Sequence, residues 1–128
     1  MPHCELITTS SFVSHQELKK AMKHSQDLGF NTVRISHLNN IFFDKWAGTP
    51  QERKEQLNQA IRSDADCIRA CIGGSGVIHF LKDIQFSELK SRPKFLVGSS
   101  DLTPLLNQSY QKTGIISLHG PNAIKRID

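Results

Sequence analysis

Apolar segments alternate with amphipathic segments from one end of the chain to the other, and this alternation restricts the fold more than any other feature. Strands that alternate with helices are typical of a parallel sheet with helices on both faces. The sequence therefore predicts one α/β domain over residues 1–128, with an open, mainly parallel sheet in three layers. About five strands are expected, at residues 5–9, 31–36, 66–72, 94–97 and 115–118.

Capping signals and glycines mark the helices between these strands. Ser14, followed three residues later by Glu17, has the spacing of a capping box, and Gly29 stands where the first helix should end. Pro50, directly after a threonine, marks the start of a second, polar helix that should end near Arg62. Further helices are expected at residues 77–81 and 86–90 and, before Gly114, from residue 102.

Residues 37–48 form a longer segment without regular periodicity, yet they include Ile41, Phe42, Phe43 and Trp46. So many apolar side chains in one segment are expected to be buried against another part of the protein or against a partner. The segment either folds back on its own domain or forms part of an interface, such as a homodimer that buries Phe42, Phe43 or Trp46. The sequence leaves both alternatives open.

The composition is that of a soluble globular protein, with 38% hydrophobic and 22% charged residues. The net charge of +4 is spread over small basic groups that acidic residues separate, and no nucleic-acid-binding motif accompanies it. Nucleic acid is therefore not expected as a partner. No apolar stretch approaches the roughly 18 residues of a membrane span, and the first residues do not resemble a signal peptide. We expect a cytoplasmic protein without membrane contact.

Cysteines and histidines indicate neither a disulfide framework nor a metal site. The three cysteines are an odd number. Cys67 and Cys71 on one strand would lie about 13 Å apart, too far for a disulfide or a shared metal. Metal-ligand spacing is missing among His3, His15, His24, His37 and His79.

Three predicted loops should line the functional crevice, because the carboxyl ends of parallel strands meet at one edge of a sheet. These loops are residues 73–76, 98–101 and 119–121. Ser100, between Gly98 and a helix start, suits a nucleophile beside backbone amides that stabilise an oxyanion, and it also suits a helix N-cap. The glycines at 73, 74 and 76 suit a phosphate cradle or a simple tight turn. The residues alone leave these alternatives open.

The order of these loops resembles that of the LD-carboxypeptidase family of serine peptidases, which includes the microcin-C self-immunity proteins. The resemblance covers essentially the whole chain. It rests on ITTSS with the helix after it, then AGTPQERKEQLNQAI, CIGGSG, FLVGSSDLT and LHGP, in that order. Ordered segments of this kind are more specific than any single motif.

By position, the resemblance assigns the nucleophile to Ser100 and the oxyanion hole to the backbone amides of Asp101, Gly73 and Gly74. It implies neither a metal nor an organic cofactor. The family's catalytic glutamate and histidine lie in a C-terminal domain after the His-Gly-Pro segment, so we expect that domain to be absent from these 128 residues. His119 is a conceivable replacement base, but the resemblance gives it a structural role and no orienting acid is evident.

The resemblance implies the N-terminal domain of a hydrolase that cleaves an amide bond in murein tetrapeptide, a related peptide or an aminoacyl-nucleotide. Without its base such a domain should be inactive alone, and a C-terminal domain or a second copy is an expected partner. Family members generally carry arginine or aromatic residues where this sequence has Ile72, Ser75 and Ser99. These differences favour an alternative, a non-catalytic binding or interaction module that retains the fold.

Overall fold

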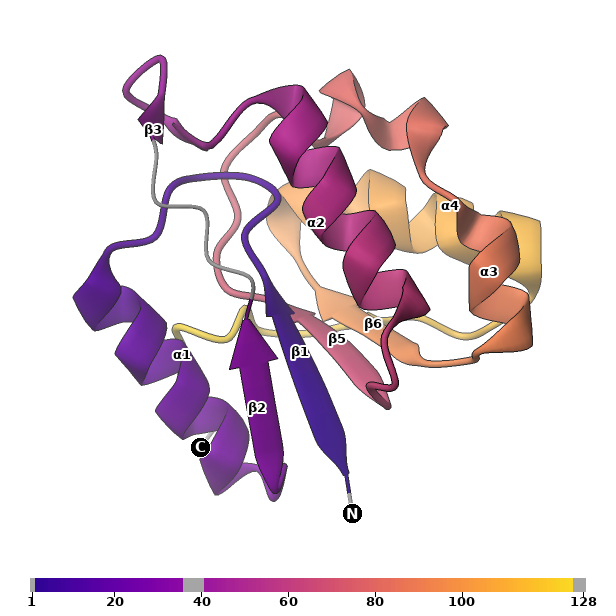
Figure 1. The fold of residues 1–128 in the computed structure, drawn as a ribbon, viewed down its shortest axis with the longest axis horizontal. Helices are drawn as coiled ribbons and strands as arrows, with labels where there is room; N and C mark the ends of the chain where they lie inside the picture. Colours follow the sequence, from indigo (N-terminus) through magenta and orange to yellow (C-terminus); the bar gives the residue numbers. More distant parts are fainter. Residues whose placement is uncertain (1, 36–40, 126–128) are drawn as a thin grey trace.

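The computed structural model describes residues 2–35 and 41–125 as an α/β fold (Figure 1). Five parallel strands form the sheet in the order β2-β1-β5-β6-β7, which confirms the predicted open parallel sheet. The strands are β1 (His3–Ile7), β2 (Thr32–Ile35), β5 (Cys67–Ala70), β6 (Phe95–Gly98) and β7 (Leu118–His119). The α-helices are α1 (His15–Asp27), α2 (Pro50–Arg62), α3 (Phe86–Ser91) and α4 (Thr103–Thr113).

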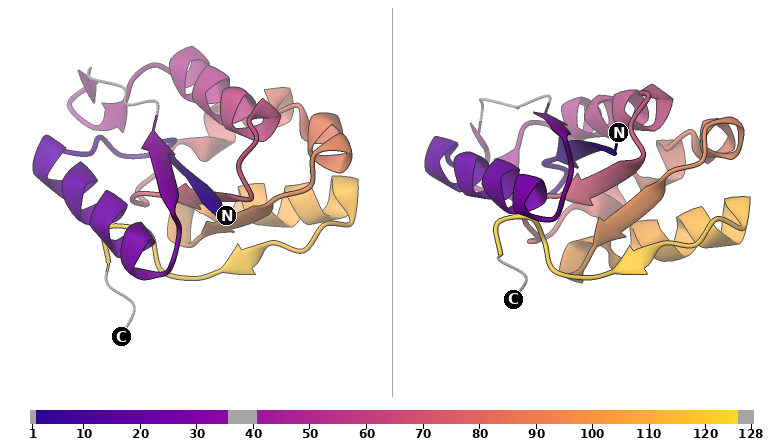
Figure 2. Two further views of the ribbon diagram at one scale, coloured as in Figure 1. Left: turned by 60° about the horizontal axis from the view of Figure 1, so that its bottom comes forward. Right: turned by 90° about the horizontal axis from the view of Figure 1, so that it is seen from below.

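The chain reverses its direction across the sheet after β2. It passes from β1 through α1 to the edge strand β2, and then returns through α2 to β5 on the other side of β1. Right-handed crossovers in opposite directions place their helices on opposite faces. Accordingly, α1 lies on one face and α2, α3 and α4 lie on the other (Figure 2). β1 and β5 flank the point where the strand order reverses, which is where open α/β sheets bind ligands.

Each face of the sheet has its own apolar cluster. Side chains of β5 alternate between the two faces and all are buried, as expected for a central parallel strand. The cluster under α2, α3 and α4 includes Leu57, Ile68, Leu89, Leu96 and Leu105. The cluster under α1 includes Cys4, Leu6, Leu18, Ala21, Cys67 and Ala123. All three cysteines are free and buried.

Both helix starts predicted from capping signals are confirmed. The Ser14 hydroxyl accepts from the backbone N–H of Glu17, and the Glu17 carboxylate accepts from the N–H of Ser14, each at 3.1 Å. Thr49 and Glu52 form the same reciprocal pair at the start of α2, also at 3.1 Å. These contacts satisfy N–H groups that a helix start leaves without intrahelical partners. Among the helices of the described residues, none is long and apolar enough to cross a membrane.

The last strand is shorter than predicted and begins later, at Leu118 instead of residue 115. The hydroxyl of Thr113 accepts from the N–H of Ile115 at 3.1 Å. Ser117 donates to a carbonyl of α4 at 3.0 Å. Both contacts hold residues 115–117 against the helix, so pairing with β6 begins only at Leu118.

The helix predicted at residues 77–81 is also different, because Phe80 has a non-helical φ of −130°. Two 3₁₀ turns replace it, η1 (Val77–His79) and η2 (Leu81–Asp83). Such turns are short because their hydrogen-bond geometry is poorer than that of an α-helix.

The segment predicted to be irregular contains a small antiparallel hairpin of β3 (Ile41–Phe42) and β4 (Trp46–Ala47). Phe43 and Asp44 adopt φ values of 50° and 53°, and the N–H of Lys45 closes the turn on the carbonyl at position 42 at 3.2 Å. Residues 37–40 of this segment, and residue 36 at the end of the strand predicted before it, lie outside the described residues.

The core packing of α4 predicts unequal effects for two substitutions on the same helix. Leu105 is 1% exposed and Tyr110 is 54% exposed. We expect Leu105→Ala to lower the free energy of unfolding by about 2–5 kcal/mol because it leaves a cavity. Tyr110→Ala should change it by about 0.5 kcal/mol or less. Urea unfolding followed by circular dichroism measures both, and equal losses would contradict the packing described here.

Candidate active site

The loops after β1, β5 and β6 meet at the point where the strand order reverses. The N–H of Ser11 donates to the carbonyl of Gly73 at 3.2 Å, which joins the first loop to the second. The N–H of Ala47 donates to the carbonyl of Ser10 at 3.1 Å, which attaches the small hairpin to the same edge. The loops after β1 and β5 are therefore joined to each other and to the hairpin at the carboxyl edge of the sheet.

Ser100 is the first residue of a 3₁₀ turn, η3 (Ser100–Leu102), between β6 and α4. Its φ is +57°, a left-handed conformation that costs an L-residue about 1–2 kcal/mol. The residue is exposed, and no side-chain hydrogen bond caps either η3 or α4. The N-cap alternative for Ser100 is therefore wrong. Its strained backbone points instead to a functional constraint on this turn.

Gly73 lies directly against the side chain of Ser100. A Cβ added at Gly73 would be 3.1 Å from the Cβ and 3.3 Å from the Oγ of Ser100. On another side, the same Cβ would be 3.4 Å from the Nδ2 of Asn122. The missing side chain at position 73 thus leaves space next to the serine hydroxyl, and Asn122 borders this space.

The carboxylate of Asp101 joins all three loops. Its Oδ2 accepts from the hydroxyl of Ser10 at 2.6 Å and from the N–H of Val77 at 3.1 Å. Hydrogen bonds to an ionised acceptor are stronger than those between neutral groups. This side chain holds the turn that carries Ser100 in register with the loops after β1 and β5.

Backbone N–H groups are available beside Ser100. Within the described residues, the N–H groups of Gly73, Gly74 and Asp101 donate no hydrogen bond to another protein group. Gly74 has a φ of +130°, and a Cβ there would lie only 2.0 Å from the Oγ of Ser11. Position 74 therefore requires glycine, both for its backbone conformation and for the space beside Ser11.

The aromatic hairpin folds back on its own domain through Trp46. The indole Nε1 donates to the carbonyl of Ser75 at 2.9 Å, and the ring contacts His79 at a centroid distance of 5.4 Å. Phe43, at the hairpin turn, remains 77% exposed. Trp46 thus packs against its own domain, whereas burial of Phe43 in a homodimer stays a prediction.

Arg53 is a residue that the sequence analysis missed. It is fully buried, and its Nη1 donates to the carbonyls of Thr9 at 3.2 Å and Gly76 at 3.1 Å. Its guanidinium lies over the rings of Trp46 and Phe80. Burial lowers the pKa of Arg53. The signal was its spacing of four residues before the buried Leu57, which places both on the inner face of α2.

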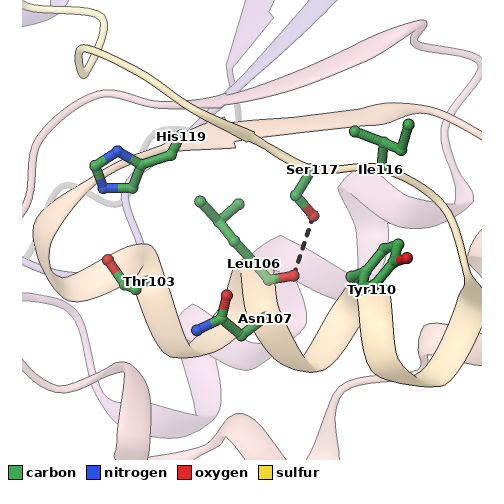
Figure 3. A pocket seen from close by; sticks show the side chains of 7 residues that line it. All are labelled: Thr103, Leu106, Asn107, Tyr110, Ile116, Ser117 and His119. Carbon is green, nitrogen blue, oxygen red and sulfur yellow. Dashed lines mark hydrogen bonds between the residues drawn. The ribbon is translucent and has the colours of Figure 1, made fainter.

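His119 does not meet Ser100. It is opposite Gly98 in the sheet register, and its side chain lies on the α4 face (Figure 3). There it lines a hollow of about 190 Å³ with Thr103, Leu106, Asn107, Tyr110, Ile116 and Ser117. In the part of the chain that the structure describes, His119 forms no hydrogen bond with Ser100 or with a carboxylate. Nor does that part contain a cluster of ligands suited to a metal ion.

The sheet is doubly wound and parallel, and a serine with a left-handed backbone and a glycine turn lie at its carboxyl edge. These features define an α/β protein with its candidate site at that edge. The family model for the LD-carboxypeptidase N-terminal domain matches residues 4–120. The chain therefore belongs to the LD-carboxypeptidase family.

Curated relatives agree with this assignment. A probable murein peptide carboxypeptidase of Bacillus subtilis is 34% identical over 117 residues, which are 91% of this chain and 36% of that protein. The microcin C7 self-immunity protein MccF of Escherichia coli is 35% identical over 79 residues, 61% of this chain and 23% of that protein. The chain thus spans about a third or less of the length of the curated relatives it matches.

Solved structures share the fold. The crystal structure of an MccF-like protein from Bacillus anthracis matches with a TM-score of 0.84 and 27% identity, over 96% of this chain and 38% of that chain. MccF in complex with aspartyl sulfamoyl adenosine matches with a TM-score of 0.85 and 25% identity, over the same shares of the two chains.

The contacts of Asp101 predict a graded loss of stability. Asp101→Ala removes the acceptor for both Ser10 and Val77, and we expect the free energy of unfolding to fall by about 1–3 kcal/mol. Asp101→Asn retains one acceptor oxygen and should lose less. Urea unfolding of the two variants checks the order. Asp101→Ala as stable as the unsubstituted chain would show that this carboxylate does not hold the loops together.

Proposed function

We propose that this chain carries the nucleophile of a serine amide hydrolase of the LD-carboxypeptidase type, and that Ser100 is that nucleophile. The observation that carries this proposal is the left-handed backbone of Ser100, whose side chain lies against Gly73 at the carboxyl edge of the sheet. A strained strand-to-helix turn is how α/β hydrolases expose a serine hydroxyl to substrate. Membership of the family supports the same assignment.

The free backbone N–H groups supply the second part of the proposed chemistry. When the serine oxygen attacks the carbonyl carbon of an amide, the carbonyl oxygen becomes negatively charged. Asp101, Gly73 and Gly74 offer N–H groups that donate to no other protein group among the described residues. Such prearranged donors stabilise the charge that develops in the transition state. We assign the oxyanion hole to these residues.

The general base is proposed to come from beyond the matched domain. In the described residues, neither a histidine nor a carboxylate forms a hydrogen bond with Ser100. Loss of the base from a serine triad lowers turnover by about 10⁶-fold. The domain by itself is therefore expected to be inactive.

The proposed substrate is a peptide amide, in murein tetrapeptide or a related peptide, or the amide-like linkage of an aminoacyl-nucleotide. Relatives are named as a murein peptide carboxypeptidase and as a microcin self-immunity protein, and MccF has been crystallised with aspartyl sulfamoyl adenosine. Ile72, Ser75 and Ser99 stand where family members generally carry larger or charged residues. These differences would change the size and polarity of the substrate pocket and leave the backbone unchanged.

A non-catalytic binding module is the second candidate function. The missing base contact at Ser100 favours it, because the same crevice can hold a peptide without cleaving it. A ligand of this module would raise the melting temperature equally in the unsubstituted chain and in Ser100→Ala. A hydrolase would be expected to lose labelling or turnover with that substitution.

Fluorophosphonate labelling tests the nucleophile. The reagent is applied to the 128-residue chain and to a hybrid in which residues 1–125 replace the matched part of the Bacillus subtilis carboxypeptidase. We expect an adduct on Ser100 in the hybrid and little or none in the chain alone, since an activated serine needs its base. Ser99→Ala, at the neighbouring serine, is the control and should keep the adduct, whereas Ser100→Ala should remove it. Release of D-alanine from murein tetrapeptide is the parallel assay, and turnover that survives Ser100→Ala would refute the assignment.

A second test concerns the space beside the nucleophile. A Cβ at Gly73 would press on Ser100, so we expect Gly73→Ala to lower labelling of the hybrid by about tenfold or more while the fold is retained. Gly120→Ala is the matched control, because a Cβ there meets only Val97 at an ordinary 3.8 Å. Equal labelling in the two variants would mean that the hydroxyl does not react on the Gly73 side.

A further inference from the structure

The side-chain amide of Asn122 has no hydrogen-bonding partner among the described residues. Its Oδ1 is buried and accepts no hydrogen bond, and its Nδ2 donates to no protein group in this part of the chain. Buried polar atoms are almost always paired, so an unpaired one requires an explanation. An apolar side chain would fill the same position without the cost of burying an unpaired oxygen. No described contact makes this amide useful to the fold, which points to a role in the site.

The backbone on both sides of Asn122 is tied to the strands that lead to the candidate site. The N–H of Gly120 donates to the carbonyl of Gly98, the last residue of β6, at 3.0 Å. The N–H of Ala123 donates to the carbonyl of Ala70, the last residue of β5, at 2.8 Å. Ala123 is also completely buried in the cluster under α1. Asn122 is thus held in place by the two strands whose loops carry the candidate site.

The amide nitrogen of Asn122 faces the space beside Ser100. A Cβ added at Gly73 would lie 3.3 Å from the Oγ of Ser100 and 3.4 Å from the Nδ2 of Asn122. Attack on a carbonyl carbon begins at about 3–3.5 Å, and an N–H···O hydrogen bond spans about 2.9 Å. A substrate carbonyl in the space that the missing side chain leaves can therefore reach the hydroxyl and the amide nitrogen at once.

The groups around this space suit an oxygen that becomes negatively charged. Gly73, Gly74 and Asp101 offer backbone N–H groups that donate to no other protein group among the described residues. The acceptor atom of the Asn122 amide is buried, so the atom left for a substrate is the donor. Asparagine side chains are among the groups that stabilise oxyanions in acyl transfer.

We propose that Asn122 is a catalytic residue, whose Nδ2–H donates to the oxygen of the scissile amide while that oxygen becomes an anion. In this step a bond forms between the Oγ of Ser100 and the carbonyl carbon, the π electrons move to the carbonyl oxygen, and the hydroxyl proton passes to the general base. When the C–N bond breaks, the carbonyl reforms and the amine leaves with that proton. Asn122 keeps both amide protons throughout. The inference rests on the proposed function of Ser100 and adds one residue to its site.

Substitutions of similar shape test the amide in the hybrid described above, with release of D-alanine from murein tetrapeptide as the assay. Asn122→Leu removes the donor, and we expect kcat to fall by about 10²-fold with little change in KM, because the hydrogen bond gains strength only as charge develops. Asn122→Asp should lower kcat further, since a carboxylate repels the oxyanion. Asn107→Leu, at an exposed position of α4, is the matched control and should leave kcat unchanged.

The outcomes separate this inference from the assignment of Ser100. Fluorophosphonate labelling of Ser100 in the hybrid, together with an unchanged kcat in Asn122→Leu, would overturn the inference and leave the nucleophile intact. A rise in KM alone would assign Asn122 to binding of the ground state and would also overturn it. So would a higher kcat in Asn122→Asp than in Asn122→Leu, because the side chain would then act as an acceptor. No labelling of the unsubstituted hybrid would overturn both proposals together.

A measurement on the 128-residue chain distinguishes a catalytic amide from a structural one. Because the Oδ1 of Asn122 is buried without a partner, we expect Asn122→Leu to keep the melting temperature or to raise it. Asn122→Ala serves as a second variant, in case the larger leucine side chain is not accommodated. A fall of about 5 °C or more in both variants would show that the amide stabilises the fold. That result would overturn the inference even if the hybrid fails to fold.

Discussion

The carboxylate of Asp101 is the contact on which the geometry of the site depends. By accepting from Ser10 and Val77, it connects three loops that leave three different strands. Among the described residues, these are the hydrogen bonds that join the turn after β6 to the loops after β1 and β5. The clamp also explains how Ser100, next to Asp101, can be held in an unfavourable backbone conformation, because local strain persists only where surrounding contacts over-determine it.

Small residues and a buried charge complete this arrangement. The glycine at position 73 lets the neighbouring loop approach Ser100 closely, and Gly74 turns the backbone so that its N–H remains free. Arg53 on α2 donates to the carbonyls of Thr9 and Gly76 and so connects the loops after β1 and β5. A buried guanidinium is costly unless acceptors or aromatic rings surround it, and Arg53 has both. We therefore interpret Arg53 as a structural residue that holds the loops in place.

Two surfaces of the described residues are exposed to solvent. One is the crevice at Ser100, which lacks a base among the described residues. The other is the apolar sheet face at Phe95 and Leu118. They differ in kind, since polar groups such as Asp101 border the first, whereas the second is apolar.

Local patterns in the sequence determined the parallel α/β fold, both capping boxes and the position of Ser100 in a strand-to-helix turn, because periodicity and capping depend on residues close in the chain. Tertiary structure alone decided the late start of β7, the burial of Arg53, the direction of His119 and the partners of Asp101. Ser10 and Asp101 are 91 positions apart, and the face that a side chain takes in an edge strand is set by its register with the next strand. Contacts of this range leave no periodic signal in a single sequence, so they become visible only when the strands are brought side by side.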